Sequence, residues 1–352
     1  MTENLYGKSR RELEKILSPL SDRPFHARQL FGWIHRRGET DFSRMTDLPG
    51  RLRAELAERF HVSLPKVEQR QASRDGAVKY LLRLEDGKGM EAVYLPEKTR
   101  VTFCISSQIG CPLGCTFCLT ARMGLVRNLT AGEIVGQVAV LAEEHGLSAN
   151  RYNLVFMGMG EPLNNYDSVL EAFRIMTDEE GLGIAPKHIT LSTAGVVPGI
   201  RRLAGENPRP RLAVSLSATT DALRGDLMPI NRAYPLPVLF QALRELPLAP
   251  RERLTLEYVL LRGINDRPED ASRLAALAGT LPVKVNLIPY NEAAVTGYAS
   301  PSLPAARAFR DRLAEKGIRA SVRRRRGADI SAACGQLAIL DPSTLERPAG
   351  AA

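Results

Sequence analysis

Apolar and polar residues change their spacing twice along the chain. Up to about residue 65, apolar side chains recur every three or four positions among charged residues, which predicts short helices separated by Pro and Gly. The helical stretches are "KSRRELEKILSPL", "FHARQLFGWIHRRG" and "LPGRLRAELAERF". Between residues 66 and 99 apolar and polar residues alternate, as in "AVKYLLRLEDG" and "GMEAVYLPEKTR". This alternation predicts a β-hairpin that turns at Asp86 and Gly87.

Beyond residue 100, short apolar strands alternate with helical stretches. The predicted strands are "VTFCIS", "RYNLVFMGM", "HITLSTAG", "RLAVSLSA", "RLTLEYVLL", "VKVNLIPY" and "RASVRR". One of the helices between them, "TAGEIVGQVAVLAEEHG", begins with Thr130 and Glu133 at capping-box spacing. Repeated βα units require a parallel sheet, which is either open or closed into a barrel.

We expect an α/β fold in which a partial (βα)6 barrel carries the main chemistry. The predicted divisions are a helical domain at 1–65, a hairpin linker at 66–99, the barrel with a C-terminal extension at 100–342, and a flexible tail at 343–352. The helical domain contains the single tryptophan, Trp33.

Polar and glycine residues collect where the predicted strands end. In a parallel barrel all strand carboxyl ends open on one face, so residues that are distant in sequence meet there. The candidates are the cysteine-rich loop after the first strand, "GMGEP" at 158–162 after the second, and Ser192, Ser215, Ser217 and Asn291 after later strands. The pattern therefore predicts one site built by several loops.

The stretch "CISSQIGCPLGCTFC" contains four of the five cysteines. Cys111, Cys115 and Cys118 have the spacing C-x3-C-x2-C, and three thiolates can bind three irons of a cubane cluster while the fourth iron stays open. A structural zinc site normally has four ligands and would need Cys104 as well. Spacing alone leaves both metals possible, but close cysteines in an odd total favour metal or redox chemistry over structural disulfides.

Composition and charge narrow the functional classes. The 352 residues carry a net charge of +9, and arginines supply much of the excess. A basic surface suits a polyanion such as RNA, although a solvated basic face explains the charge equally well. No apolar run approaches the ~20 residues that span a bilayer, and the N-terminus lacks the apolar segment of a signal peptide. We therefore expect a cytoplasmic protein.

The cysteine motif, with Phe117 before its last cysteine, resembles the signature of radical S-adenosylmethionine (SAM) enzymes. Longer segments narrow this resemblance to the RlmN family, whose members methylate C2 of adenine in 23S rRNA and in tRNA. Those segments are "FCISSQIGCPLGCTFCLTARMGLVRNLTAGEIVGQV", "NLVFMGMGEPL", "ITLSTAGVVPGI", "MPINRAYP", "LTLEYVLL", "VNLIPYN" and "RRGADISAACGQLA". The segment "FHARQLFGWIHRRGETDFSRMTDLP" is similar to the family's helical RNA-binding domain.

The resemblance implies cofactors, partners and residue roles. It implies a 4Fe-4S cluster on the three motif cysteines, two SAM molecules per turnover, RNA substrates, a reductant such as flavodoxin or ferredoxin, and a monomeric enzyme. Cys334 would carry the methyl group as S-methylcysteine, Cys104 would resolve the protein–RNA adduct through a transient disulfide with Cys334, and Glu91 would accept the C2 proton. The implied SAM contacts are Gly160, Glu161, Ser192, Ser215, Leu216, Ser217 and Asn291. The chain departs from the family at Ser217, where histidine is usual.

Three alternatives stay open at this point. The sister family methylates C8 of adenine with equivalent cysteines, although "RRGADI" before Cys334 favours the C2 type. Other radical SAM enzymes act without RNA, and a zinc-stabilised RNA-binding protein would have no catalytic activity. The arginine run Arg323 to Arg326 is either an RNA contact or a charged strand edge.

Overall fold

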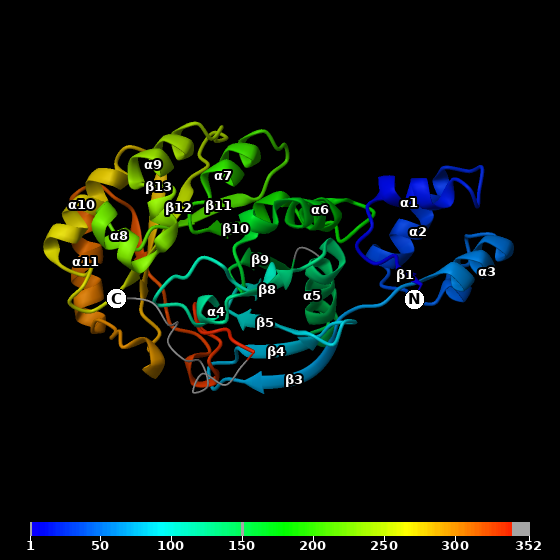
Figure 1. The fold of residues 1–352 in the computed structure, drawn as a ribbon, viewed down its shortest axis with the longest axis horizontal. Coiled ribbons are helices and arrows are strands. Elements are labelled where there is room, and N and C mark those ends of the chain that lie inside the picture. Colours follow the sequence, from blue (N-terminus) through cyan, green and yellow to red (C-terminus); the bar gives the residue numbers. More distant parts are fainter. Residues whose placement is uncertain (1, 149–150, 340–352) are drawn as a thin grey trace.

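The structure is a computed structural model that describes residues 2–148 and 151–339 (Figure 1). The predicted tail at 343–352 lies outside this range. The N-terminal region is helical, as expected, and its short strands β1 (Glu3–Asn4) and β2 (Phe60–His61) pair in parallel. Its helices are α1 (Arg10–Leu17), α2 (Phe25–Phe31), the π-helical turn η1 (Gly32–Arg36), the 3-10 turn η2 (Phe42–Arg44) and α3 (Gly50–Arg59).

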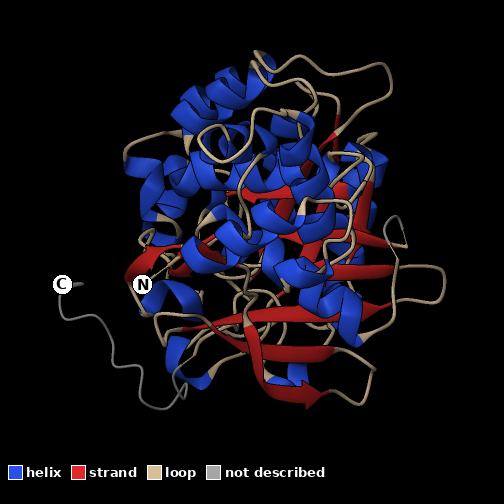
Figure 2. Ribbon diagram, turned by 90° about the vertical axis from the view of Figure 1, so that its right-hand side faces the viewer, coloured by secondary structure: helices blue, strands red, loops and turns tan. Residues whose placement is uncertain are grey.

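A ten-stranded sheet forms the centre of the molecule, in the order β14-β13-β12-β11-β10-β9-β6-β5-β4-β3. Figure 2 shows these strands with helices packed against the sheet. The parallel strands are β6 (Val101–Cys104), β9 (Tyr152–Phe156), β10 (Ile189–Thr193), β11 (Arg211–Ser215), β12 (Leu254–Leu260), β13 (Val283–Pro289) and β14 (Ala320–Val322). Each lies within a stretch predicted as a strand, which confirms the α/β architecture.

Helices cover the outer side of the parallel strands because each βα connection returns along the sheet (Figure 1). They are α5 (Ala131–Glu144), α6 (Tyr166–Thr177), α7 (Val197–Ala204), α8 (Asp221–Leu227), α9 (Leu236–Arg244), α10 (Pro268–Ala278) and α11 (Leu303–Glu315). The capping box at the start of α5 is present, since the Thr130 side chain accepts from the Glu133 N–H and the Glu133 side chain accepts from the Thr130 N–H. The apolar faces of these helices and strands form one continuous core.

The predicted hairpin is part of the main sheet and has a third strand. Strands β3 (Lys66–Ala72), β4 (Val78–Arg83) and β5 (Gly89–Pro96) are antiparallel, and β5 pairs with β6 so that Val93 lies opposite Cys104. This pairing extends the barrel sheet on the side of its first strand. It also brings Glu91, in the middle of β5, into the same layer as Cys104.

The N-terminal region contacts the barrel where two glycines meet. Gly7 has a φ of +86°, and a Cβ atom there would lie 2.1 Å from the Cα of Gly132 at the start of α5. A Cβ atom on Gly132 would lie 2.3 Å from the carbonyl oxygen of Tyr6. Backbone therefore packs directly on backbone at this junction, and neither position has space for a side chain.

We expect Gly132→Ala to lower the free energy of unfolding by about 1–3 kcal/mol, because the methyl group must displace backbone rather than a flexible side chain. Gly225→Ala is the matched control, since Gly225 lies inside α8 and a Cβ atom there meets nothing within 4 Å. That control should be neutral or stabilising by ~0.5–1 kcal/mol. Urea unfolding of both variants is the measurement, and equal stabilities would refute the packing argument.

Candidate active site

The cysteine loop runs between β6 and α5 and is anchored by a small ribbon. Strands β7 (Gln108–Gly110) and β8 (Leu125–Asn128) pair antiparallel on either side of it. The Cys111 N–H donates to the Gly124 carbonyl at 2.8 Å. The helix α4 (Leu119–Arg122) begins directly after Cys118. The ribbon and helix together hold the motif as a compact turn at the mouth of the barrel.

The predicted residues converge on one pocket of about 160 Å³. Of the predicted residues, those that line it are Cys111, Cys115, Cys118, Gly160, Glu161, Ser192, Ser215, Asn291 and Cys334. Ser192 and Ser215 lie at the ends of β10 and β11, and the other residues follow β6, β9, β13 and β14. These strands are parallel, so the structure brings together residues separated by more than two hundred positions. The residues converge because the carboxyl ends of parallel strands open on one face of the barrel.

The three motif thiols suit a cationic cluster. Burial raises the pKa of Cys111 to about 12 and raises the pKa values of Cys115 and Cys118 as well. The charges of Cys118 and Cys111 raise the pKa of Cys115 further, so thiolates here need a positive group between them. Within residues 2–148 and 151–339 no three His, Cys, Asp or Glu side chains are placed to hold a single metal ion. In a cubane, however, each thiolate binds its own iron, so the three cysteines fit that group.

Glu161 is a structural part of the pocket wall. It is buried, and its carboxylate accepts from the backbone N–H groups of Leu163 at 3.0 Å and Ala194 at 2.7 Å. Burial raises its pKa to about 7. The preceding Gly160 has a φ of +99°, and a Cβ atom there would lie 2.5 Å from the Gln108 side chain. Both residues of this motif therefore set the path of the chain between β9 and β10.

Two of the predicted SAM contacts do not reach the pocket lining. Leu216 and Ser217 are fully buried behind it. Ser217 has a φ of +52°, and its carbonyl accepts from Asn265 Nδ2 at 2.7 Å. Its hydroxyl has no hydrogen-bond partner among the described residues. Position 217, where the sequence departs from the family, therefore lies one layer deeper than we expected.

Cys334 lies on a loop that folds over the cluster motif. Its carbonyl accepts from Asn291 Nδ2 at 3.2 Å, and the carbonyl of Gly335 accepts from the Leu119 N–H at 2.8 Å. The hydroxyl of Thr120 donates to the Leu337 carbonyl at 2.6 Å. Cys334 itself is exposed and lines the pocket. The loop is thus tied to both α4 and the end of β13.

Cys104 and Cys334 are both free thiols, so the structure does not contain the disulfide bond that we expected to form transiently between them. The physical reason is that two thiols do not join unless an oxidant is present or one sulfur carries a leaving group. Cys104 is buried at the end of β6, and the charge of Cys334 contributes to its raised pKa. Cys104 also packs in one apolar cluster with Ala332 and Leu337, which flank Cys334 in the loop, so the two thiols lie in the same region without a bond.

Glu91 lies on β5, two residues before the Val93 that pairs with Cys104, and outside the pocket lining. Its carboxylate is buried and contacts Lys79 Nζ at 3.0 Å, while Oε2 has no hydrogen-bond partner among the described residues. Burial raises its pKa despite the nearby ammonium group. The backbone N–H of Ala338, on the Cys334 loop, also donates to it. Glu91 is therefore a buried base with one free oxygen next to the loop.

Sequence reasoning missed Arg224, which is completely buried. Its guanidinium donates to the carbonyls of Leu216, Ser215 and Ala194 and to Asn231 Oδ1. It thus ties together the ends of β10 and β11. Burial lowers its pKa to about 10. An arginine in a helical stretch normally indicates a solvated face, so no signal in the sequence marked it.

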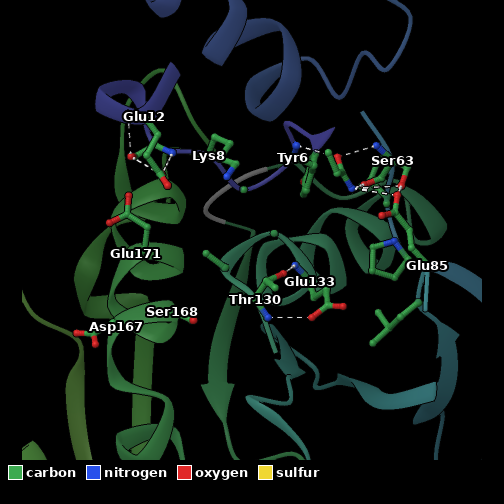
Figure 3. Close-up of a pocket in the computed structure, with 18 residues that line it drawn as sticks. Tyr6, Lys8, Glu12, Ser63, Glu85, Thr130, Glu133, Asp167, Ser168 and Glu171 are labelled. Carbon is green, nitrogen blue, oxygen red and sulfur yellow. Dashed lines mark hydrogen bonds between the residues drawn. The ribbon is translucent and has the colours of Figure 1, made fainter. Parts of the chain in front are cut away.

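A larger cavity of about 620 Å³ lies between the N-terminal region and the starts of α5 and α6 (Figure 3). Acidic side chains face it, but several are already engaged. Glu133 binds the Thr130 N–H and Arg127, and Glu12 accepts from Ser9. The cavity contains none of the predicted catalytic residues. It is a groove of the interface between the two regions.

Comparisons with known proteins agree with this site. The family "Ribosomal RNA large subunit methyltransferase N-terminal domain" matches residues 3–62, and "Radical SAM superfamily" matches residues 105–275. The chain is 48% identical, over 96% of its length and 92% of the relative's, to "Dual-specificity RNA methyltransferase RlmN" of Anaeromyxobacter dehalogenans (strain 2CP-C). It is 48% identical to the same-named protein of Geobacter sulfurreducens, over 95% and 91% of the two chains.

A solved structure is similar over almost the whole fold. The crystal structure of a radical SAM methyltransferase from Sphaerobacter thermophilus is 42% identical in sequence and superposes with a TM-score of 0.86. The match covers 95% of this chain and 98% of that one. Among the described residues, no helix has the length and apolar character to cross a membrane.

We expect Arg224→Met to lower the free energy of unfolding by about 2–4 kcal/mol, because several buried acceptors lose their donor together. Arg232→Met is the matched control, since Arg232 is exposed a few residues later in the chain. That control should change the stability by no more than about 0.5 kcal/mol. Urea unfolding measures both, and a small effect at position 224 would contradict the role assigned to its hydrogen bonds.

Proposed function

Because the chain belongs to the RlmN family of radical SAM dual-specificity RNA methyltransferases, we propose that it methylates C2 of adenine in 23S rRNA and in tRNA. The family assignment confirms the resemblance found in the motifs and removes the alternative of a non-catalytic zinc protein. The observation that carries the proposal is the meeting of Cys334 with the three motif cysteines in one pocket, in a chain that matches the family over nearly its whole length.

Cys111, Cys115 and Cys118 would hold the 4Fe-4S cluster, and the surrounding wall would hold SAM. Ser192, Ser215 and Asn291 line the pocket, and the Oδ1 atom of Asn291 has no partner among the described residues. When bound, the cluster and SAM supply a methyl group and a 5′-deoxyadenosyl radical, which give access to an electron-poor ring carbon. A donor such as flavodoxin or ferredoxin would provide the electron.

Cys334 would carry the methyl group as S-methylcysteine. Loss of one hydrogen atom from that methyl group to the 5′-deoxyadenosyl radical would leave the methylene carbon that bonds to C2 of adenine, and the adduct would give up one electron to the cluster. Glu91 would then remove the C2 proton. Its burial favours this role, because a carboxylate with a raised pKa is a stronger base than one in water. Its unpartnered Oε2 is free to accept that proton. Lys79 restrains the other carboxylate oxygen.

Cys104 would resolve the adduct by attacking the sulfur of Cys334. An S–S bond forms while the bond between that sulfur and the methylene carbon breaks, and its electron pair passes to carbon, which takes up a proton to become the methyl group. An external thiol reductant would return the cysteines to the reduced state that the structure contains. Cys104 is suited to this step because it is a free thiol that packs against the loop carrying Cys334.

The helical region would supply part of the RNA affinity, since a target adenine must leave its stack at a cost of a few kcal/mol. Residues 3–62 match the family's N-terminal domain. The net charge of +9 supports binding to a polyanion. We also infer that the enzyme acts in the cytoplasm, where both RNAs are found, and that it acts as a monomer.

Mass spectrometry of rRNA and tRNA tests the proposal. Cells that lack the gene and carry the wild-type chain on a plasmid should contain 2-methyladenosine in both RNAs, and cells with Cys334→Ala should contain none, because no sulfur then carries the methyl group. Appearance of 8-methyladenosine would instead assign the sister activity. Methylation of only one RNA would narrow the substrate class.

We expect Cys104→Ala, produced together with its RNA, to accumulate a covalent protein–RNA adduct, because the sulfur that releases the product is missing. Denaturing gel electrophoresis with and without ribonuclease measures the adduct. Cys111→Ala is the matched control, since loss of a cluster ligand should prevent the adduct from forming. If Cys104→Ala yields methylated RNA and no adduct, Cys104 is not the resolving thiol.

A further inference from the structure

Arg323 belongs to a run that the sequence places at the surface, but it points into the molecule. It directly follows β14, and its N–H donates to the Leu287 carbonyl at 2.8 Å. Its guanidinium Nη1 lies 3.7 Å from Met157 Sδ, beyond the end of β9. Strands β10 to β13 separate β14 from β9 in the sheet, so the side chain reaches across the mouth of the barrel.

The other arginines of the run are placed differently. Arg325 donates to Ser300, and Arg326 forms an ion pair with Asp75 at 3.0 Å. Arg324 is exposed. Of these four arginines, only Arg323 is directed toward the sulfur atoms of Met157, Cys104 and Cys334. No carboxylate of the described residues lies within 4 Å of its guanidinium. The run is therefore divided between surface contacts and one inward charge.

Met157 connects this guanidinium to Cys104. Its backbone N–H donates to the Cys104 sulfur, while its own sulfur contacts Arg323. Cys104 pairs with Val155 in the sheet, and Met157 follows Val155 by two residues. The pairing of β6 with β9 therefore keeps Met157 close to Cys104. The guanidinium and the Cys104 sulfur thus contact the same residue, Met157.

We propose that Arg323 is a positioning residue for the sulfur exchange and stabilises the thiolate of Cys104 as it attacks Cys334. The inference rests on the function proposed above and assigns a residue that the reaction scheme does not include. In the exchange the S–S bond forms, the sulfur–methylene bond breaks, and carbon receives the electron pair and then a proton. Cys104 must enter this step as the anion, because a thiolate is the nucleophile in such reactions.

Burial disfavours the thiolate form of Cys104, and the positive charge of Arg323 favours it. Loss of solvent is the main reason that the pKa of Cys104 is raised far above its usual value. The charge of Cys334 adds to this in the free enzyme but not in the adduct, where that sulfur is alkylated. Arg323 and the Met157 N–H are the groups that lower it. The titratable and charged groups around the two side chains are Cys334, Glu257, Glu97, Lys284 beside Glu257 and, beyond Cys334, Cys118. Of the two cations, Arg323 is the one whose charge acts on Cys104.

The test is the single-turnover decay of the protein–RNA adduct over a range of pH. In Arg323→Met we expect the adduct to form but to decay about tenfold more slowly than in the wild type near neutral pH. A rise of about one in the pKa of Cys104 would lower its thiolate fraction by that factor. The rate should recover as the pH is raised, because the anion then forms without help. Arg323→Lys should lie between the two. Arg319→Met, at an exposed arginine just before β14, should decay like the wild type.

Two results would overturn the proposal. Decay of the Arg323→Met adduct at the wild-type rate at every pH would show that the charge is not used. Decay that is slowed equally at every pH would show a merely structural role. If Arg323→Met does not fold, the Lys variant and peptide-resolved alkylation of Cys104 against pH decide, since the alkylation midpoint should rise when the cation is weakened. If the wild type forms no adduct, the proposed function fails, whereas the alkylation profile still reports on Arg323.

Discussion

Parallel pairing of strands is the constraint on which the rest of this structure depends. The register that places Cys104 opposite Val155, and Ser192 opposite Ala213, makes the strands end together at one mouth. Every functional loop begins there, so the site needs no single long loop to assemble it. The hairpin β3 to β5 continues the same sheet and adds Glu91 to the edge of the site. Backbone hydrogen bonding therefore sets the positions from which the chemistry is built.

Buried polar side chains then fix the loops that leave those strands. Arg224 binds carbonyls from two strand ends, and Glu161 binds N–H groups from two loops. Such groups are expensive to bury unless each polar atom has a partner, so their presence makes the loop conformations specific. Some polar atoms near the pocket, including Asn291 Oδ1 and Glu257 Oε2, keep no partner among the described residues. The fully hydrogen-bonded side chains therefore support the site, while the polar atoms without a partner remain available to a ligand.

The C-terminal segment completes the site by returning across the mouth. Its edge strand β14 ends beside Arg323, and the following loop carries Cys334 over the cluster motif. The loop hydrogen-bonds to α4, to the segment after β13 and to Glu91. The last part of the chain thereby couples the cluster motif, the base and the buried thiol. The N-terminal region contacts the start of α5 through the close approach of Gly7 and Gly132.

The strands and the capped helix α5 could be predicted from the sequence because apolar spacing and capping act over a few residues. The three motif cysteines could also be recognised as candidate cluster ligands, since their spacing within one short loop is a local property of the sequence. Three features could not be predicted: the direction of Arg323, the burial of Arg224 and the burial of Ser217 behind the pocket wall. Each depends on contacts between segments far apart in the chain, and an arginine or serine carries no local signal of which way it will face. The sequence by itself determined the elements and the reacting atoms, while the tertiary structure decided which charges surround those atoms, because burial and electrostatics arise only after the sheet has closed.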